Sequence, residues 1–352
     1  MTPGKGQSEA AVIGNPQSQG ADGPLATDLA GIRLRNPVVL AAGTCGLLDE
    51  MADVLDLSRV GAVVTKSITP EPRDGNETWR IIDAGPAGML NAIGLANPGL
   101  EAFLEHVAPR AAKVPCRVFA SVAGFSIEDY VRAAANIDEW ASPERGGAIP
   151  AIELNVSCPN VKTGTEFGGS ASLLRELLGA VRPVVKHARL IVKLSPAAAE
   201  LPLLARAAIA AGADVLTLGN TYPAMAIDVE TRRPRLANRT GGLSGPGIHP
   251  IALKHVYDVR RLVTAETGTP IIGLGGVMRW QDAAEFILAG ATAVGMGTAL
   301  FADPRSPIGV VRGLEGWVRR QGVAGVRDLV GAVSQWEHLG VGGEGVSVGG
   351  GC

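Results

Sequence analysis

Eight short segments of the chain are apolar almost without interruption, and this constrains the fold more than any other feature. They begin at Pro37, Ala62, Val118, Ile152, Ile191, Val215, Pro270 and Ala293. Strands with both faces buried belong to parallel sheets, because helices cover both sides of such sheets. Helical stretches with apolar residues at i, i+3 and i+4 follow several segments, for example at 172–187, 199–212 and 282–290. Eight such units predict an α/β fold, a (β/α)8 TIM barrel with extended loops at its C-terminal face.

A doubly wound open sheet is the alternative architecture for the same alternation of strands and helices. Such a sheet that binds a dinucleotide carries GxGxxG after its first strand, but here the first strand is followed by AAGTCG. The glycine pairs instead close the last two strands, as GLGG (273–276) and GMGT (295–298). Barrels bind phosphate at that place, so the sequence favours the barrel.

The barrel is expected over residues 28–325, between two segments of different composition. Residues 1–27 are rich in Gly, Pro, Ser and Gln and are expected to form a disordered tail. Residues 326–352 form a C-terminal segment with a Gly-rich end that we expect to be mobile. The N-terminus lacks the apolar core of a secretory signal and the Arg-rich pattern of a transit peptide, which predicts a cytoplasmic protein.

Two connections are longer than a plain barrel needs. One runs from Ser67 to Arg117, and the other from Thr221 to His249, where alternating residues around a turn predict a β-hairpin. Both follow C-terminal ends of strands, which is the catalytic face of such a barrel. Long loops at that face usually bind or cover ligands.

Composition excludes several classes of function. The chain has 32 Lys and Arg against 34 Asp and Glu, a net charge of −2, which argues against nucleic acid or an anionic membrane as partner. A run of about 18 apolar residues, as a membrane span requires, is missing from the sequence. The cysteines have no CxxC spacing and the histidines no HxxxH spacing, so we expect no metal site; the cysteines are Cys45, Cys116, Cys158 and Cys352.

Two lysines and two glycine-containing turns lie at strand ends. Lys66 ends the second apolar segment and Lys193 lies inside the fifth. A lysine in an apolar strand is costly unless an anion pairs with it, although a lysine at a barrel rim can extend its ammonium into water. Gly275–Gly276 and Gly297–Thr298 follow the last two strands, where backbone N–H groups can approach a phosphate. Ordinary turn chemistry could explain either pair alone, but with the lysines they indicate an anionic cofactor or substrate.

The segment ELNVSCPNVKTG (153–164) carries the most specific chemistry. Asn155 ends the fourth strand, and Cys158 and Asn160 follow it around a proline. A buried structural cysteine is the commoner case. Here the thiol lies on a loop at the catalytic face between two amides, which favours a reactive role. Asn91, Asn220 and Thr221 add amide and hydroxyl groups to the same face, suited to a planar polar ring; Asn91 and Asn220–Thr221 lie in the two long connections.

An ordered series of motifs resembles the dihydroorotate dehydrogenase family, class 1. The matching segments span about Leu29 to Pro304 and are TKSITPEPRDGN (65–76), NAIGLANPG (91–99), NVSCPN (155–160), KLSP (193–196), GNT (219–221), ANRTGGLSGP (237–246), GLGGV (273–277) and GTALFADP (297–304). The cysteine before Pro159 is similar to class 1, because class 2 enzymes have serine there and a membrane-associating extension. KLSP and ANRTGGLSGP resemble the B subclass, whose FMN-binding catalytic subunit works with a separate iron–sulfur/FAD subunit that passes electrons to NAD. The A subclass uses fumarate.

The resemblance implies roles for individual residues. Cys158 would be the general base that removes the C5 proton of dihydroorotate as the C6 hydride moves to the flavin, and Lys66 would contact flavin and substrate. Substrate contacts are implied for Lys66, Asn91, Ile93, Gly94, Leu95, Asn155, Asn160, Asn220 and Thr221. FMN contacts are implied for Ala42, Gly43, Lys66, Ser67, Ser121, Asn155, Lys193, Gly219, Gly245, Gly275, Gly276, Gly297 and Thr298. The resemblance also implies a homodimer that joins the iron–sulfur/FAD subunit in a heterotetramer.

Three positions depart from the family pattern. Ala42 stands where a serine is usual, Ser121 replaces an asparagine, and Gly219 replaces an aliphatic residue. The first leaves a backbone contact possible, and the second would shorten a hydrogen bond to the flavin or route it through water. The third would loosen packing against the flavin ring. We expect altered flavin affinity or potential with activity retained.

Three other functions compete with this interpretation. A related FMN barrel that acts on dihydrouracil or dihydrothymine also has a cysteine after an asparagine, but typically lacks the second asparagine of CPN. A lyase or isomerase could use Lys66 or Lys193 as a Schiff base. A non-catalytic binding barrel would keep the glycine turns, but would not need Cys158 together with the loop asparagines.

Overall fold

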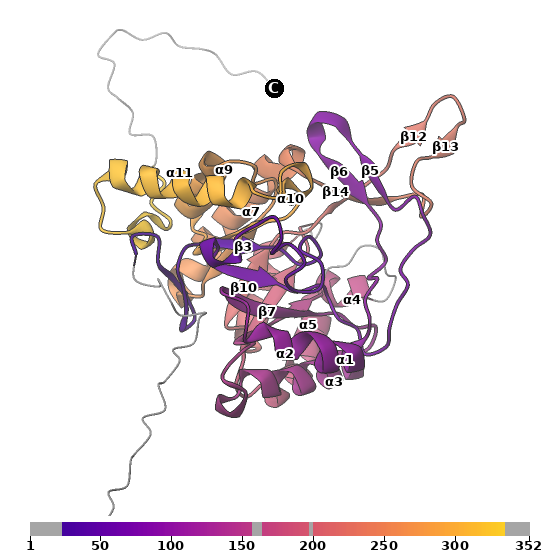
Figure 1. Ribbon diagram of the computed structural model, residues 1–352, viewed down its shortest axis with the longest axis horizontal. Helices are drawn as coiled ribbons and strands as arrows, with labels where there is room; N and C mark the ends of the chain where they lie inside the picture. The colour runs from indigo at the N-terminus through magenta and orange to yellow at the C-terminus, as the bar shows by residue number, and fades with distance from the viewer. Residues whose placement is uncertain (1–22, 157–163, 197–199, 335–352) are drawn as a thin grey trace, which may run out of the picture.

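The computed structural model describes residues 23–156, 164–196 and 200–334 of the chain. Eight parallel strands close into a barrel in which each hydrogen-bonds to two neighbours (Figure 1). In barrel order they are β3 (Val38–Leu40), β4 (Ala62–Val64), β7 (Arg117–Val122), β8 (Ala151–Asn155), β9 (Arg189–Leu194), β10 (Val215–Leu218), β15 (Ile271–Leu274) and β16 (Ala293–Met296). Each strand lies within or beside one of the eight apolar segments, so the predicted TIM barrel is confirmed.

Helices surround the barrel, and the three predicted helical stretches are confirmed as α5, α6 and α9. The helices are α1 (Leu100–Ala102), α2 (Ala108–Ala111), α3 (Ile127–Asp138), α4 (Gly164–Gly169), α5 (Ala171–Val181), α6 (Leu201–Ala210), α7 (His249–Val259), α8 (Ala265–Thr267), α9 (Trp280–Ala289), α10 (Ala299–Ala302) and α11 (Ser306–Gln321). Their apolar faces and the outer faces of the strands form the main core. In the described part of the chain, none of the helices is both long and apolar enough to cross a membrane.

A hairpin that the sequence analysis did not identify packs against the inside of the barrel. It consists of β1 (Thr27–Leu29) and β2 (Ile32–Leu34), which pair antiparallel. Leu29, Ile32 and Leu34 share a separate buried cluster with interior residues of the barrel strands, such as Phe119. Because these side chains pack against the interior residues, the hairpin covers one end of the barrel. Each buried leucine or isoleucine side chain stabilises the fold by about 1.5–3 kcal/mol. The site must therefore open at the other end.

A small antiparallel sheet rises from the carboxyl ends of the barrel strands, at the upper right of Figure 1. Its strand order is β11 (Tyr222–Ala224), β14 (Gly241–Ser244), β6 (Met89–Asn91) and β5 (Ile81–Asp83). The sheet joins the two long connections, because β6 pairs with β14. The hairpin predicted in the second connection is confirmed by the pairing of β12 (Ile227–Asp228) with β13 (Arg233–Pro234).

The two ends of the described chain pack together. The backbone N–H of Val326 donates to the carbonyl of Pro24 at 2.8 Å. Leu25, Val326 and Leu329 are buried in the main core. The expected disordered and mobile tails lie mostly outside the described residues.

Candidate active site

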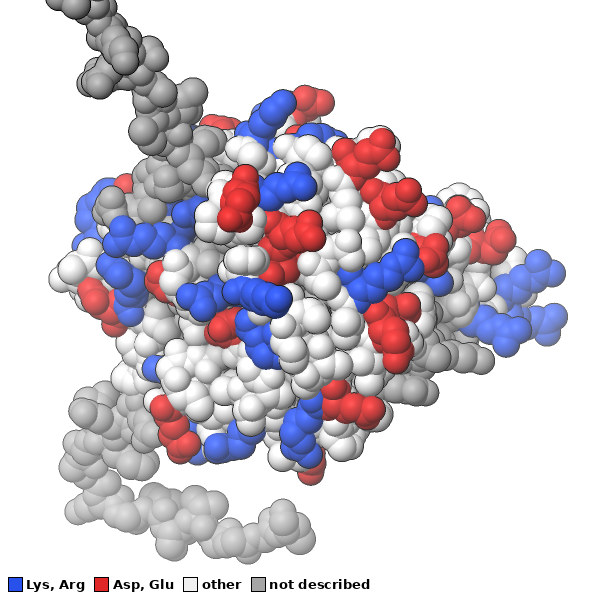
Figure 2. Space-filling view, turned by 90° about the horizontal axis from the view of Figure 1, so that it is seen from below, with Lys and Arg blue, Asp and Glu red and all other residues white. Residues whose placement is uncertain are grey.

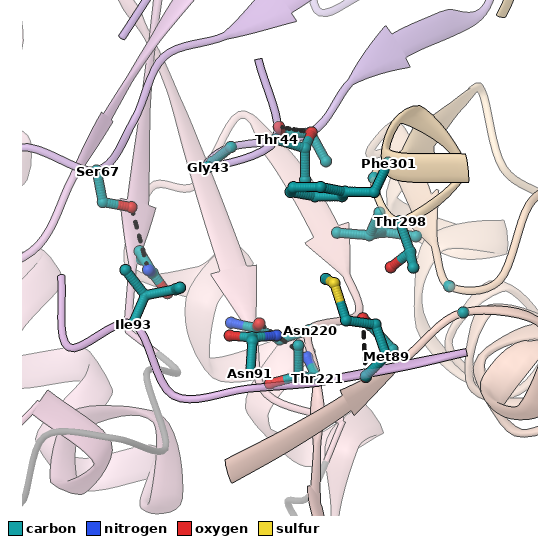
Figure 3. A pocket seen from close by; sticks show the side chains of 18 of the residues that line it. Gly43, Thr44, Ser67, Met89, Asn91, Ile93, Asn220, Thr221, Thr298 and Phe301 are labelled. Atoms are coloured by element: carbon teal, nitrogen blue, oxygen red, sulfur yellow. Dashed lines mark hydrogen bonds between the residues drawn. The ribbon is translucent and has the colours of Figure 1, made fainter. Parts of the chain in front are cut away.

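One cavity lies at the carboxyl ends of the barrel strands, between the strand ends and the small sheet (Figure 3). It brings together seventeen of the residues that the sequence analysis assigned to the site. They are Ala42, Gly43, Lys66, Ser67, Asn91, Ile93, Gly94, Leu95, Asn155, Lys193, Asn220, Thr221, Gly245, Gly275, Gly276, Gly297 and Thr298. These residues come from both long connections and from seven of the eight barrel strands or the loops after them, so only the closed barrel places them around one space.

Two predicted flavin contacts lie behind the lining instead of on it. Ser121 is fully buried, and its hydroxyl lies 2.8 Å from the Ser67 hydroxyl, which does line the cavity. Ser121 therefore reaches the cavity through Ser67. Gly219 has φ +131°, and a Cβ there would lie 1.9 Å from the carbonyl oxygen of Leu274. The missing side chain at Gly219 thus makes room for a neighbouring strand, which differs from the loosened ring packing expected from the sequence.

Cys158 and Asn160 lie outside the described residues. The last described residue before them is Val156, directly after Asn155, and Asn155 is on the cavity wall. The roles assigned to this thiol and this amide stay predictions.

The charges around the cavity suit an anionic ligand. Among the residues that the structure describes, the lining contains Lys66 and Lys193 and no Asp or Glu. Lys193 is 5% exposed. The Lys66 ammonium lies beside Gly43, since a Cβ on that glycine would come within 3.4 Å of Nζ. Two lysines in a partly enclosed space attract an anion more strongly than they would in open water.

Side-chain amides form a second group on the wall. Figure 3 shows Asn91, Asn220 and Thr221 gathered on one side of the cavity, opposite Thr44 and Phe301. The Thr221 backbone N–H donates to Oδ1 of Asn220 at 2.8 Å. Asn155 donates from Nδ2 to the Ser67 hydroxyl at 3.2 Å, which holds it in place. Amides can both donate and accept, so this wall matches a ring whose edge alternates N–H and C=O groups.

The loop after β6 is fixed by a residue that the sequence analysis did not assign. Leu95, on the cavity wall, has the left-handed φ of +59°. Asn97 is buried and donates from Nδ2 to the Leu95 carbonyl at 2.7 Å. Its Oδ1 accepts from the backbone N–H groups of Thr69 at 3.2 Å and Gly99 at 2.9 Å. Asn97 therefore ties the loop after β6 to the segment after β4.

Three glycines from two separate loops form another part of the cavity wall. Gly245, Gly275 and Gly276 all have positive φ. A Cβ on Gly276 would lie 2.6 Å from the Gly245 carbonyl oxygen, and one on Gly275 would lie 2.4 Å from Cβ of Ala252. Backbone turns packed this closely leave their polar groups accessible to a phosphate. The cavity wall thus combines a closely packed glycine turn, side-chain amides and two lysines.

The lining also contains residues that the sequence did not single out. They are Ala41, Thr44, Ile81, Met89, Ser244, Ile248, Leu274 and Phe301. Most are apolar and can cover the faces of a planar ring. Their only signal was their place beside quoted motifs, such as Phe301 within GTALFADP.

The two described cysteines cannot serve as reactive thiols. Cys45 and Cys116 are buried. Burial raises the pKa of each thiol from 9.0 to about 12, so both stay protonated at neutral pH. The described residues contain no group of three or more His, Cys, Asp or Glu side chains that could bind a metal ion.

Comparison with known proteins identifies the family. The family model described as dihydroorotate dehydrogenase matches residues 24–317, which is most of the barrel. The chain belongs to the dihydroorotate dehydrogenase family. The resemblance seen in the motifs is thereby confirmed over residues 24–317, and the cavity at the barrel mouth is the candidate active site of a family member.

Relatives within the family are similar over nearly their whole length. The chain is 46% identical over 310 residues to "Dihydroorotate dehydrogenase B (NAD(+)), catalytic subunit" of Pelobacter propionicus, covering 88% of this chain and 98% of the relative. It is 44% identical to the protein of the same name from Bacteroides fragilis, with the same coverage. Among solved structures, the crystal structure of DHODH in complex with ferulenol from Eimeria tenella superposes with a TM-score of 0.72 at 25% identity, covering 90% of each chain.

Proposed function

We propose that this chain is the catalytic subunit of a B-type dihydroorotate dehydrogenase, which oxidises (S)-dihydroorotate to orotate in pyrimidine (UMP) biosynthesis. The observation that carries the proposal is the cavity itself. In a chain of this family, two lysines, a wall of amides and a glycine turn surround one space at the barrel mouth. The dihydroorotate carboxylate suits the lysines, and its ring amides suit the asparagines.

FMN is the cofactor that we propose for this cavity. It would be held by Gly245 and, around its phosphate, by Gly275, Gly276, Gly297 and Thr298, all of which line the cavity. Lys66, Lys193 and Ser67 would contact the ring system. When bound, FMN supplies the acceptor for the hydride that leaves C6 of the substrate.

The protein's own residues then have three tasks. Asn91, Asn155, Asn220 and Thr221, with Asn160, would hold the pyrimidine by its edge and so orient C6. Lys66 would contact both the substrate and the cofactor and provide a positive charge between them. Cys158 would take the proton from C5 as general base, which leaves the C5–C6 double bond of orotate once the hydride has gone.

The electron acceptor requires a second protein. The relatives are named as NAD(+)-dependent catalytic subunits. The chain has neither CxxC spacing nor a dinucleotide fingerprint after its first strand. We therefore propose that electrons pass to NAD through a separate iron–sulfur/FAD subunit, that the catalytic chain forms a homodimer, and that the complex works in the cytoplasm.

The decisive experiment is anaerobic reduction of the purified chain by dihydroorotate. The wild-type protein should be yellow, release FMN on denaturation and bleach with dihydroorotate. Cys158→Ala should keep the cofactor and bleach about 1,000-fold more slowly at neutral pH, because general-base catalysis contributes about 10² to 10⁴. Cys158→Ser should be slow at neutral pH and faster as pH rises.

Cys116→Ala is the matched control, because it removes a thiol that is buried in the main core. It should bleach at the wild-type rate. Normal bleaching of Cys158→Ala would remove the base assignment, and bleaching by dihydrouracil in preference to dihydroorotate would favour the related pyrimidine reductases. Isolation of the complex from its native host would test the proposed partner subunit.

A further inference from the structure

His249 lies directly behind the glycine turn and belongs to no role described so far. It is the first residue of α7, and its side chain is 11% exposed. A Cβ on Gly276 would come within 2.8 Å of the His249 Cβ and 3.0 Å of its backbone nitrogen. The ring packs edge-to-face on Phe286, with 5.1 Å between centroids. The imidazole is therefore fixed in one orientation against the turn.

Both ring nitrogens of His249 face hydrogen-bond acceptors. Nδ1 lies 3.0 Å from the carbonyl oxygen of Gly275. Nε2 lies 2.9 Å from Oε2 of Glu285, on α9. A carbonyl oxygen can only accept, and an ionised carboxylate can only accept, whereas a neutral imidazole has a single N–H. With Glu285 ionised, both bonds form only when the ring carries both protons.

We propose that His249 is a positioning residue for the cofactor phosphate: its imidazolium, paired with Glu285, fixes the Gly275–Gly276 turn and places a positive charge behind it. The bond to the Gly275 carbonyl orients that peptide, so the backbone groups of the turn face the cavity. The charge adds to the turn's attraction for a phosphate dianion. This inference rests on the proposed binding of FMN.

The chain offers sharp variants for a test. His249→Gln removes the charge, and His249→Lys keeps it near Glu285. Glu285→Gln removes the partner, whose side chain is 51% exposed and so tolerates the change. His255→Gln is the matched control, because His255 lies on the same helix but stacks on Tyr222, away from the turn.

The first measurement needs no cofactor. A long-range ¹H–¹⁵N spectrum of the cofactor-free wild-type protein at pH 7 reports the protonation of each imidazole nitrogen, and the signal absent from His249→Gln assigns the residue. We expect both nitrogens of His249 to be protonated. A neutral His249 ring would overturn the proposal, because the hydrogen atom shared between His249 and Glu285 would then come from a protonated Glu285.

The second measurement is the dissociation constant of FMN, followed by quenching of flavin fluorescence. His249→Gln and Glu285→Gln should each weaken binding about tenfold, the effect of losing one charge-assisted hydrogen bond. The double variant should be no weaker than either single one, because the two residues act as a unit. His249→Lys should stay within about threefold of wild type, and His255→Gln should not differ from it.

Equal FMN affinities of wild type and His249→Gln would overturn the inference while leaving the proposed function intact. Additive losses in the double variant would also overturn it, because they would mean two independent structural effects. Wild-type protein that binds no FMN at all would instead refute the proposed function. If His249→Gln does not fold, the signal absent from His249→Lys assigns the residue, and the wild-type spectrum together with the FMN affinity of Glu285→Gln still decides.

Discussion

Asn97 provides the sharpest test of how the loop after β6 is held. In Asn97→Ala the N–H groups of Thr69 and Gly99 and the carbonyl of Leu95 each lose a partner. All three residues are buried, so water does not readily replace the lost bonds. An unpaired buried group costs about 1 kcal/mol or more, which makes the total about 3 kcal/mol.

This free energy falls first on the conformation that the loop has in the structure, since Leu95 already has a left-handed φ of +59°. A ligand that binds to this conformation must then supply the difference. Because 1.4 kcal/mol corresponds to tenfold, the dissociation constant of orotate and the KM for dihydroorotate should rise about 100-fold. Isothermal titration with orotate and steady-state kinetics measure the two quantities.

Asn97→Asp separates this effect from a general loss of stability. It keeps the oxygen that accepts from Thr69 and Gly99 but loses the donor to the Leu95 carbonyl, so we expect about a tenfold loss of orotate affinity. Asn136→Ala is the control, because Asn136 is an exposed asparagine whose amide donates to the Arg132 carbonyl within α3. Wild-type orotate affinity in a folded Asn97→Ala variant would refute the reasoning.

Two further predictions concern the glycine turn and the buried thiols. Gly276→Ala should weaken FMN binding tenfold or more, because the added Cβ clashes with the Gly245 carbonyl and displaces the turn. Gly268→Ala is the control, since Gly268 has a similar φ of +70° and open space around it. It should lower only the free energy of unfolding, by about 1 kcal/mol. Because the pKa of Cys45 and Cys116 is raised to about 12 in the fold, their contribution to stability is complete below pH 9 and falls as pH rises from about 9 to 12. Urea unfolding of a variant with alanine at both positions should show a shallower decline over that range; an unchanged slope would contradict the assigned burial effect.

The barrel could be predicted because its strands are buried on both faces. Burial of both faces produces continuous apolar segments that stand out in a sequence, as at Val215–Leu218, where all four residues are buried. The β5 strand lacks this signal, since Ile81 is exposed and the strand has three residues. It exists because β6 pairs with it on one side and with β14, about 150 positions away, on the other. A local pattern cannot contain that information.

The residues of the site fall into two groups: those that line the cavity, and those behind them that hold its backbone in place. Lysines in strands, asparagines at strand ends and glycine pairs are unusual where they occur, so the sequence revealed them, and the family resemblance assigned the rest. Asn97 and His249 are ordinary residues locally. Their importance comes from backbone carbonyls of Leu95 and Gly275 that only the folded chain brings to them. The residues that line such a cavity can therefore be predicted from sequence more readily than the residues that hold its backbone in place.

Gly219 shows why a departure from a family pattern cannot be interpreted without the backbone. From sequence alone, replacing an aliphatic residue by glycine indicates lost packing beside the flavin. In the fold, the direction in which a side chain would extend is occupied by the Leu274 carbonyl, 1.9 Å from an ideal Cβ. An aliphatic side chain at this position thus requires a different path of the chain between β10 and Asn220. Since Asn220 is on the cavity wall, that path also sets where one of the amides proposed to bind the substrate lies. The glycine should therefore influence substrate contacts through the backbone more than flavin packing through volume.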